Sequence, residues 1–269
     1  KIIFRLLTTL LIAFMLSSCS ASKAEPPFSP AHHTTTGFKN LYVDDTSKSL
    51  FGFLAMKLLG ETKWANHAIR SEEVPVMNLN SESIQFNSDD LRVSWLGHCT
   101  FLLQWKGVNI LTDPVFSDRV SPFSFVGPKR YIPHVTDYKN LPPIDYVIIS
   151  HNHYDHLDVP TLKALAQRNP RTVFFVPLGN GELLRDNNIS RVVELDWGQQ
   201  ADFRSLTVHC LPSQHWSKRT LTDNNRALWA SWAVTSPKRR IYYAGDSGYF
   251  PGFTEIGDQL GPFDLAIVP

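Results

Sequence analysis

This chain of 269 residues has a small net charge, few cysteines and few long apolar runs. A formal net charge of +1 gives no sign of the basic excess or stripe that nucleic-acid-binding proteins usually carry, so no nucleic-acid partner is expected. The apolar run from Leu6 to Leu16 is too short for a membrane-spanning helix. What is present is ordinary for a soluble globular protein: 43% of the residues are hydrophobic and 19% are charged. The length suffices for one large domain with a sizeable core.

The first 19 residues have the features of a targeting segment. Lys1 and Arg5 give it a positive start, and the apolar run has the length of the central region of a signal peptide. Leu16-Ser17-Ser18-Cys19 resembles the lipobox of bacterial lipoproteins, in which the cysteine is lipidated; the alternative is a plain secretory signal with an incidental cysteine. Ser20 resembles the outer-membrane sorting pattern. We therefore expect residues 1–19 to be a lipoprotein signal peptide and Cys19 to anchor the protein in the bacterial outer membrane, facing the periplasm.

Two cysteines remain for the folded part, Cys99 and Cys210. In an oxidising periplasm they could pair, and otherwise they are two small buried thiols. Neither has the spacing of a metal ligand. The chain starts at Lys1 rather than at Met, and the segment from Phe263 to Pro269 is typical of a strand that stops abruptly. We therefore expect a fragment of a longer protein, with the carboxy-terminal part of the domain missing.

The composition divides the rest of the chain into two regions. Residues 20–90 are expected to form a tether and an amino-terminal extension, because Ser, Thr, Pro and Ala dominate up to about Asn40. Within it, the apolar stretch from Ser47 to Leu59 predicts a short helix that either touches a bilayer or covers the core of the domain. The folded domain is expected to occupy residues 91–269, and no internal repeat is visible in it.

Short apolar segments and turn signals predict strands in hairpins, with helices inserted between them. Lys106-Gly107 is a tight hairpin signal between two of these strands. Pro160 to Arg168 is predicted as a helix that begins near Asp158. The pattern is typical of two sheets with helices outside them, and periodicity alone leaves α/β and α+β open. The predicted strands are 91–95, 101–105, 108–111, 144–150, 173–176, 205–211, 227–235 and 240–243.

A dense cluster of metal-binding side chains follows the predicted strand 144–150. It reads His151-Asn152-His153-Tyr154-Asp155-His156, and imidazoles and carboxylates are the ligands that a catalytic zinc ion takes. In an extended turn His151 and His153 can point toward one ion, whereas Asp155 and His156 then serve a neighbouring one. The alternatives are a surface histidine tract or a coincidence, but such a cluster at the end of a buried strand would be costly to bury without metal.

The pattern His-x-His-x-Asp-His after an apolar strand resembles the signature of the metallo-β-lactamase superfamily. That resemblance implies an α/β fold of the four-layer αββα sandwich type, with two Zn²⁺ or other divalent ions at the edge of the two sheets. Downstream, His215 and Asp246 each follow a predicted strand, in the order in which the superfamily places its next ligands. By resemblance His151, His153 and His215 hold one ion, Asp155 and His156 hold the second, and Asp246 bridges them. A seventh ligand, a histidine, is expected outside this fragment.

Further segments resemble one branch of the superfamily, the N-acyl phosphatidylethanolamine-hydrolysing phospholipase D family. The resemblance extends from about Leu91 to Pro269 and implies that a hydroxide bridging two ions attacks the phosphorus of a phospholipid, with the membrane reached through the lipid anchor. The alternatives are a lactonase, whose relatives share the opening Trp-Leu-Gly-His but whose task is cytosolic, and a non-catalytic envelope protein, which has no need of six ligands. The matching segments are 94–98, 111–117, 127–130, 141–145, 151–158, 194–197, 212–221, 228–234 and 261–266.

Residue roles follow from the same resemblance. Asp155 and Asp246 are the expected catalytic residues, Asp155 because it can also orient the attacking hydroxide. Asp113 is expected to support the ligands from behind, and His98 either does the same or only packs. Phosphate contacts or a solvated basic surface are the two interpretations of the basic residues near the site, which are Lys129, Arg130, Lys218 and Arg219.

Overall fold

The computed structural model describes residues 30–43, 55–56, 59–60, 74–77, 79, 81–85, 90–123 and 125–269. The expected signal peptide, Cys19 and most of the helix expected from Ser47 to Leu59 lie outside these residues. Among the described helices, none combines the length and the apolar character needed to cross a membrane.

The first sheet combines an antiparallel and a parallel half. Its strands are β1 (Arg92–Gly97), β2 (Thr100–Trp105), β3 (Val108–Thr112), β4 (Tyr146–Ile148), β5 (Val173–Pro177) and β6 (Val192–Leu195), side by side in that order. The pairs from β1 to β3 are antiparallel, and those from β3 to β6 are parallel. Lys106 and Gly107 join β2 to β3 with φ values of 53° and 70°, as a two-residue turn matched to the strand twist requires.

The second sheet has the order β11-β10-β9-β8-β7 among the described strands. Its pairs are antiparallel except for β10 with β11, which is parallel. The strands are β7 (Gln200–Phe203), β8 (Leu206–Leu211), β9 (Ser231–Thr235), β10 (Arg240–Tyr243) and β11 (Leu265–Ile267).

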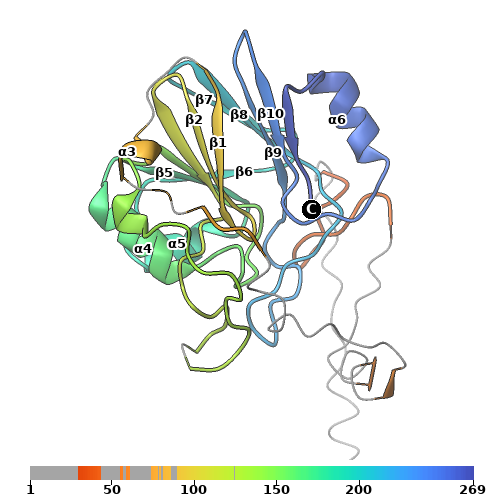
Figure 1. The fold of residues 1–269 in the computed structure, drawn as a ribbon. Coiled ribbons are helices and arrows are strands. Elements are labelled where there is room, and N and C mark those ends of the chain that lie inside the picture. Colours follow the sequence, from red (N-terminus) through yellow and green to blue (C-terminus); the bar gives the residue numbers. More distant parts are fainter. Residues whose placement is uncertain are drawn as a thin grey trace, which may run out of the picture.

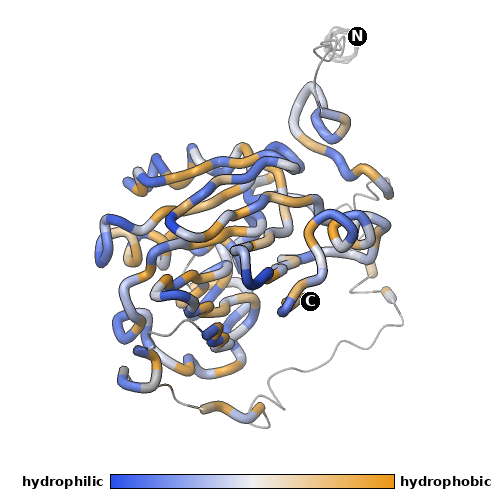
Figure 2. The backbone as a smooth tube through the Cα atoms, turned by 90° about the horizontal axis from the view of Figure 1, so that it is seen from above, coloured by the Kyte–Doolittle hydropathy of each residue, from blue (hydrophilic) through white to orange (hydrophobic). Residues whose placement is uncertain are grey.

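Helices cover the outer face of each sheet, which gives four layers (Figure 1). Side chains alternate along the strands: Leu103 and Tyr146 face the second sheet in one apolar cluster, whereas Leu102 and Val147 face the helices in another. A third cluster lies between the second sheet and its helix. Along the helices polar and apolar residues alternate (Figure 2), as one-sided packing requires. The helices are α3 (Ser81–Ile84), η3 (Tyr138–Asn140), α4 (Val159–Arg168) and α5 (Gly181–Asp186) on one side and α6 (Gly252–Leu260) on the other.

This architecture confirms the expected α/β sandwich of two sheets between helices. Strands occur in every predicted stretch, but β4 and β9 are shorter than the apolar runs that contain them, because both runs continue as buried loops toward one edge of the sandwich. The helix predicted from Pro160 begins at Val159, after Asp158. The strands β6 and β7 and the helices α3, η3, α5 and α6 were not predicted, since their apolar patterns are short.

The domain was expected to begin at Leu91, but residues before Leu91 also contact it. Ile84 is 1% exposed and belongs to the cluster under the first sheet, and its carbonyl accepts a hydrogen bond from the Gln104 side chain at 3.0 Å. Residues 30–43, expected to be a tether, also contact the domain, through hydrogen bonds such as that from the Phe38 amide to the Asn225 carbonyl at 2.8 Å. Parts of the amino-terminal extension therefore belong to the folded domain.

Candidate metal centre

The predicted metal-binding residues lie on three loops at one edge of the sandwich. The segment from His151 to His156 follows β4, His215 lies in the loop after β8, and Asp246 follows β10. The amide of His156 donates to the carbonyl of His153 at 3.1 Å, which turns the chain toward α4. Both sheets thus contribute to the site, and residues that are up to 95 positions apart in the numbering, from 151 to 246, meet there.

His151, His153 and His215 form a close group, which we call the three-histidine group. The Nε2 atom of His151 lies 2.8 Å from Nδ1 of His153 and 3.2 Å from Nε2 of His215, and the last two atoms are 3.3 Å apart. Nitrogens bound tetrahedrally to zinc at 2.0–2.1 Å would be about 3.3 Å apart. The spacing therefore fits three ligands of one ion.

Two buried side chains fix which nitrogen of His151 and His156 faces the site. The Ser150 hydroxyl donates to Asp113 Oδ2 at 2.5 Å and lies 2.9 Å from Nδ1 of His151, so we assign the Nδ1 proton of His151 to a bond to this hydroxyl. Nδ1 of His156 lies 2.7 Å from Asp113 Oδ2 and donates to it. In the neutral form of both rings Nε2 then carries a lone pair directed at the site, as metal ligation requires.

The three-histidine group is held neutral by its surroundings. Burial, followed by the neighbouring imidazoles, lowers the pKa of His151 well below its ordinary value. Burial also lowers the pKa of His153 and of His215 to about 4 in each case. Because a metal ion binds the neutral imidazole, these residues can accept an ion at neutral pH without first losing a proton.

Asp155, His156 and Asp246 form the neighbouring set, which we call the mixed group. Nε2 of His156 lies 3.4 Å from Asp246 Oδ2 and 3.8 Å from Asp155 Oδ2. Asp246 Oδ2 also lies 3.8 Å from Nε2 of His215, so this carboxylate stands between the two groups. Nε2 of His156 is buried and makes no hydrogen bond. A buried nitrogen without a partner, facing two carboxylates, fits a cation between them.

The charges of the mixed group are strongly coupled. Burial by itself would lower the pKa of His156, but its contacts with Asp113 and Asp246 outweigh burial and raise the pKa to about 10. Burial would raise the pKa of Asp155, yet the hydrogen bond with His98 and the charge of His156 hold it below its ordinary range. Without a metal ion, a proton on His156 therefore supplies the positive charge that the carboxylates require.

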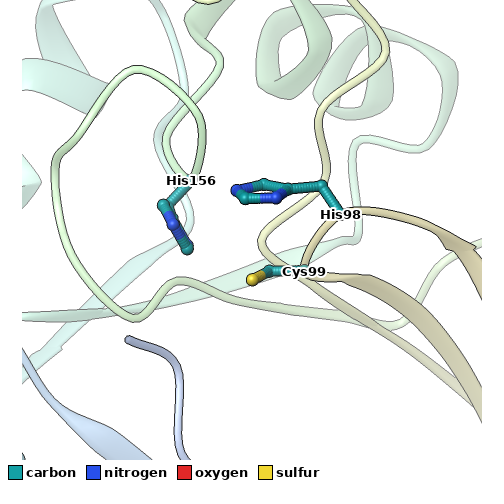
Figure 3. A group of neighbouring side chains, drawn as sticks. All are labelled: His98, Cys99 and His156. Atoms are coloured by element: carbon teal, nitrogen blue, oxygen red, sulfur yellow. The ribbon is translucent and has the colours of Figure 1, made fainter. Parts of the chain in front are cut away.

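His98 lies beside the mixed group. Its Nε2 atom is 3.2 Å from Asp155 Oδ2, and its ring meets that of His156 edge-on with centroids 5.0 Å apart. Figure 3 shows His98 and Cys99 both directed toward His156. His98 has a φ of 46°, which is uncommon for residues other than glycine. Its backbone thus turns the imidazole toward the carboxylate of Asp155.

Asp113, which was expected to support the ligands from behind, lies behind the histidine loop and connects the two sheets. Its carboxylate is fully buried and accepts hydrogen bonds from the Ser150 amide at 2.7 Å and from the Tyr243 hydroxyl at 2.5 Å, besides the bonds from the Ser150 hydroxyl and His156. Tyr243 belongs to β10 and Asp113 follows β3. One carboxylate therefore sets the orientation of the histidine loop relative to both sheets.

The basic residues do not share one environment. The Arg219 guanidinium donates to the carbonyls of Asn152 and Leu157, both at 2.8 Å, and stacks on the ring of Tyr154 at 3.9 Å. Arg219 therefore supports the histidine loop, and these contacts give no support to the predicted phosphate contact.

For the other three basic residues the two interpretations were likewise a phosphate contact and a solvated basic surface. Arg130 donates to the Val115 carbonyl at 2.5 Å. Lys129 is exposed and Lys218 is half-buried, and for both the phosphate contact stays a prediction.

The two cysteines of the folded part are both free thiols, Cys99 half-buried and Cys210 buried. The Sγ atom of Cys99 lies 4.0 Å from Asp246 Oδ1, at the rim of the mixed group. Sequence reasoning missed this proximity and also the roles of Ser150, Tyr243 and Arg219. Only Ser150 had a signal in the sequence, its place next to the histidine cluster, because the other contacts depend on how the sheets pack.

Comparisons with known proteins agree with this fold. A family model described as "Beta-lactamase superfamily domain" matches residues 108–269. The "N-acyl-phosphatidylethanolamine-hydrolyzing phospholipase D 1" of Caenorhabditis elegans is 38% identical over 231 residues, which cover 82% of this chain and 65% of that protein. An uncharacterized protein of Mycobacterium tuberculosis is 46% identical over 209 residues, covering 76% of this chain and 55% of that protein.

A solved structure shares the fold. CmlA, a diiron beta-hydroxylase from Streptomyces venezuelae, superposes with a TM-score of 0.50 and 23% identity over 67% of this chain and 34% of that chain. The chain spans 65% and 55% of the lengths of the two curated relatives above. The family match covers more than half of the chain. The chain therefore belongs to the β-lactamase superfamily, with the metallo-β-lactamase type of fold, and it is similar to proteins named as N-acyl-phosphatidylethanolamine-hydrolyzing phospholipases D.

Proposed function

We propose that this chain acts as a metal-dependent phosphodiester hydrolase, with phospholipase D-type cleavage of N-acyl phosphatidylethanolamine or a related lipid. The observation that carries the proposal is the position of Asp246 between two ligand groups, 3.4 Å from His156 and 3.8 Å from His215. A single carboxylate between two sets of ligands is the arrangement that a bridged metal pair needs. The similarity to the phospholipase D of C. elegans supports the substrate class.

We assign zinc to both positions. Imidazole nitrogens and carboxylate oxygens are ligands of catalytic zinc, and the nitrogen spacing of the three-histidine group fits that ion. When bound, such a pair lowers the pKa of water and stabilises negative charge on the attacking and leaving oxygens. The supporting residues Ser150 and Asp113 would keep the histidine tautomers ready for ligation.

The proposed reaction transfers one phosphoryl group to water. Water oxygen forms a bond to phosphorus, the bond from phosphorus to the ethanolamine oxygen breaks, and the proton of water ends on the released alcohol. The products are phosphatidate and an N-acylethanolamine. Asp155 would orient the attacking water, since its carboxylate lies next to both His98 and His156. Lys129 and Lys218 are the residues proposed to contact the phosphate.

A lipid anchor would place the site at a membrane that contains its substrate. We propose attachment through Cys19 to the bacterial outer membrane, on the basis of the motif Leu16-Ser17-Ser18-Cys19. Changing Cys19 to serine should move the protein from the membrane fraction to the soluble fraction. Unchanged membrane association of this variant would rule out the anchor.

The function is tested with full-length protein by metal analysis and by product release. About two zinc ions per chain and release of N-acylethanolamine from vesicles of N-acyl phosphatidylethanolamine are expected. Asp246→Asn should lower the release rate at least 100-fold, whereas Asp264→Asn, which alters a carboxylate bonded to Arg240 on the same sheet, should leave it within about twofold. Hydrolysis of lactones without hydrolysis of phosphodiesters would refute the proposed reaction. A purified protein that contains no metal would refute the proposed metal-dependent enzymatic function.

A further inference from the structure

Residues 30–43 form a segment that we call the N-terminal strap, and it is attached to the domain near the metal centre. The Nε2 atoms of His32 and His33 lie 2.6 and 2.8 Å from the two oxygens of Asp196, which is buried in the loop after β6. The ring of His32 stacks on Trp197 with centroids 4.4 Å apart. These contacts fix one end of the strap on the domain.

The middle of the strap follows a path that tolerates no side chain at Gly37. A Cβ atom there would lie 2.1 Å from the carbonyl oxygen of Asn225, far inside van der Waals contact. The neighbouring Phe38 amide donates to this same carbonyl at 2.8 Å. The close approach brings the next residues of the strap, up to Asn40, against the loop that carries His215.

The loop with His215 is held in place by hydrogen bonds from other segments to three successive backbone carbonyls of the loop. The carbonyl of Ser213 accepts from the indole of Trp229 at 3.0 Å, and that of Gln214 accepts from the Gly248 amide at 2.8 Å. The carbonyl of His215 accepts from the Asn40 side chain at 2.8 Å. Each of the three donors comes from a different segment of the chain, and Asn40 is the one that contacts the ligand residue itself.

His215 depends on its backbone for orientation more than His151 and His156 do, and Nε2 of His153 likewise makes no hydrogen bond to the described residues. The second ring nitrogen of His151 is bonded to Ser150, and that of His156 is bonded to Asp113. Within the described part of the chain, no hydrogen bond holds Nδ1 of His215, whose ring contacts are to the other ligands and to Trp216. The direction of this imidazole therefore follows from the path of residues 213–215.

We propose that Asn40 is a positioning residue for His215, and that the N-terminal strap is thereby part of the metal centre. Asn40 suits this role because its amide has both a donor and an acceptor: Nδ2 donates to His215, and Oδ1 accepts from the Trp229 indole at 3.2 Å. It ties the ligand to an indole that is 0% exposed. The inference rests on the proposed function, because it assumes an ion at the three-histidine group.

The test separates positioning from general support of the fold. Asn40→Asp keeps the size and the acceptor for Trp229 but removes the donor to His215, and Asn40→Ala removes both. Tyr42→Phe is the matched control, since it removes a hydrogen bond of the strap to Glu255 on α6 without touching the ligand loop. Apoprotein of each full-length variant is titrated with zinc against a chelating dye, and the absorption spectrum of the cobalt-substituted protein is recorded.

Loss of support behind a ligand typically weakens metal affinity 10- to 100-fold. Both Asn40 variants should therefore weaken the ion of the three-histidine group at least tenfold and shift its cobalt spectrum, with the ion of the mixed group changed less than threefold. Tyr42→Phe should keep both affinities and the spectrum. A second route is Gly37→Ala, which should reproduce the Asn40 effect by displacing the strap.

Two outcomes overturn the inference without touching the function. One is wild-type zinc affinity and spectrum in soluble, folded Asn40 variants, and the other is equal weakening in Tyr42→Phe. If the wild-type chain itself binds no zinc, the proposed function fails first. Circular dichroism of each apoprotein identifies a variant that does not fold. If Asn40→Ala does not fold, the zinc affinities of Asn40→Asp and Gly37→Ala decide between the outcomes.

Discussion

Replacing Asp113 by asparagine tests the view that one carboxylate fixes the protonation of the site. Asp113 accepts four hydrogen bonds, from the amide and hydroxyl of Ser150, from His156 and from Tyr243. The amide oxygen of the asparagine can keep the bond from the Ser150 amide. Its NH₂ group then faces three former donors with only two hydrogens.

The two hydroxyls can rotate and accept, whereas His156 can accept at Nδ1 only by moving its proton to Nε2. That proton points at the mixed group and opposes an ion there. Hydrogen bonds to charged groups contribute about 1.5–3 kcal/mol each, and the new bonds recover part of the loss. We expect the free energy of unfolding of the apoprotein to fall by about 2–4 kcal/mol.

Zinc affinity at the mixed group should fall about 10- to 100-fold. The Ser150 oxygen can accept from both the new amide and His151, so the ion of the three-histidine group should be retained. The assay is a zinc titration of the apoprotein that resolves two dissociation constants. Asp145→Asn is the control, because Asp145 bonds Asn109 and Arg204 at the opposite end of β4. Equal loss at both sites, or no loss at either, would refute the reasoning.

Two further predictions concern the apoprotein. The pKa of His156 is raised to about 10, so its stabilising effect is complete below the unfolded value of about 6.5 and is lost as pH rises toward 10. The pKa values of His153 and His215 are lowered to about 4, so their contribution is present above about 6.5 and lost as pH falls to 4. The free energy of unfolding, measured in urea, should therefore be greatest near pH 6.5. The His156→Gln variant should not show the decrease between pH 6.5 and 10, which is on the order of 2–4 kcal/mol in the unchanged protein. A free energy of unfolding that stays constant from pH 6.5 to 10 in the unchanged protein would count against this. Gly245→Ala should destabilise the protein by about 3 kcal/mol or more, because a Cβ atom there would lie 2.4 Å from the Cβ atom of Ser150. Gly198 also has a positive φ but faces open space, so Gly198→Ala should destabilise the protein by only about 1 kcal/mol. Equal losses in the free energy of unfolding for the two variants, measured in urea, would contradict this reasoning.

The fold could be predicted where local chemistry decides it. The hairpin at Lys106-Gly107 and the strand that leads into His151 were predictable, because these turn residues and a short buried apolar run are compatible with few other conformations. Strand β7 was not predictable, since its alternating exposed and half-buried residues resemble a loop. Helix α6 begins after Pro251 without a side-chain cap, so the usual start signal is missing there.

The sequence predicted which histidine and aspartate side chains meet at the candidate site and in what order they follow along the chain. The spacing within His151 to His156 separates two groups of ligands, and the resemblance added His215 and Asp246. What supports them could not be predicted, because Tyr243 reaches Asp113 across the space between two sheets. Arg219 was interpreted from its charge as a phosphate contact, but its position under the histidine loop directs the guanidinium to backbone carbonyls.

If the proposed ions bind, the meeting of both sheets at the ligand edge would couple metal supply to the lifetime of the protein. A ligand that binds only the native state stabilises it by RT ln(1 + [L]/Kd), about 2.7 kcal/mol when the free ion is at 100 times its Kd. Each ion bound there would hold β4, β8 and β10 together through their terminal loops. Zinc starvation would then raise the fraction of chains open to proteases at the same time as it stops turnover, so that idle copies are removed first.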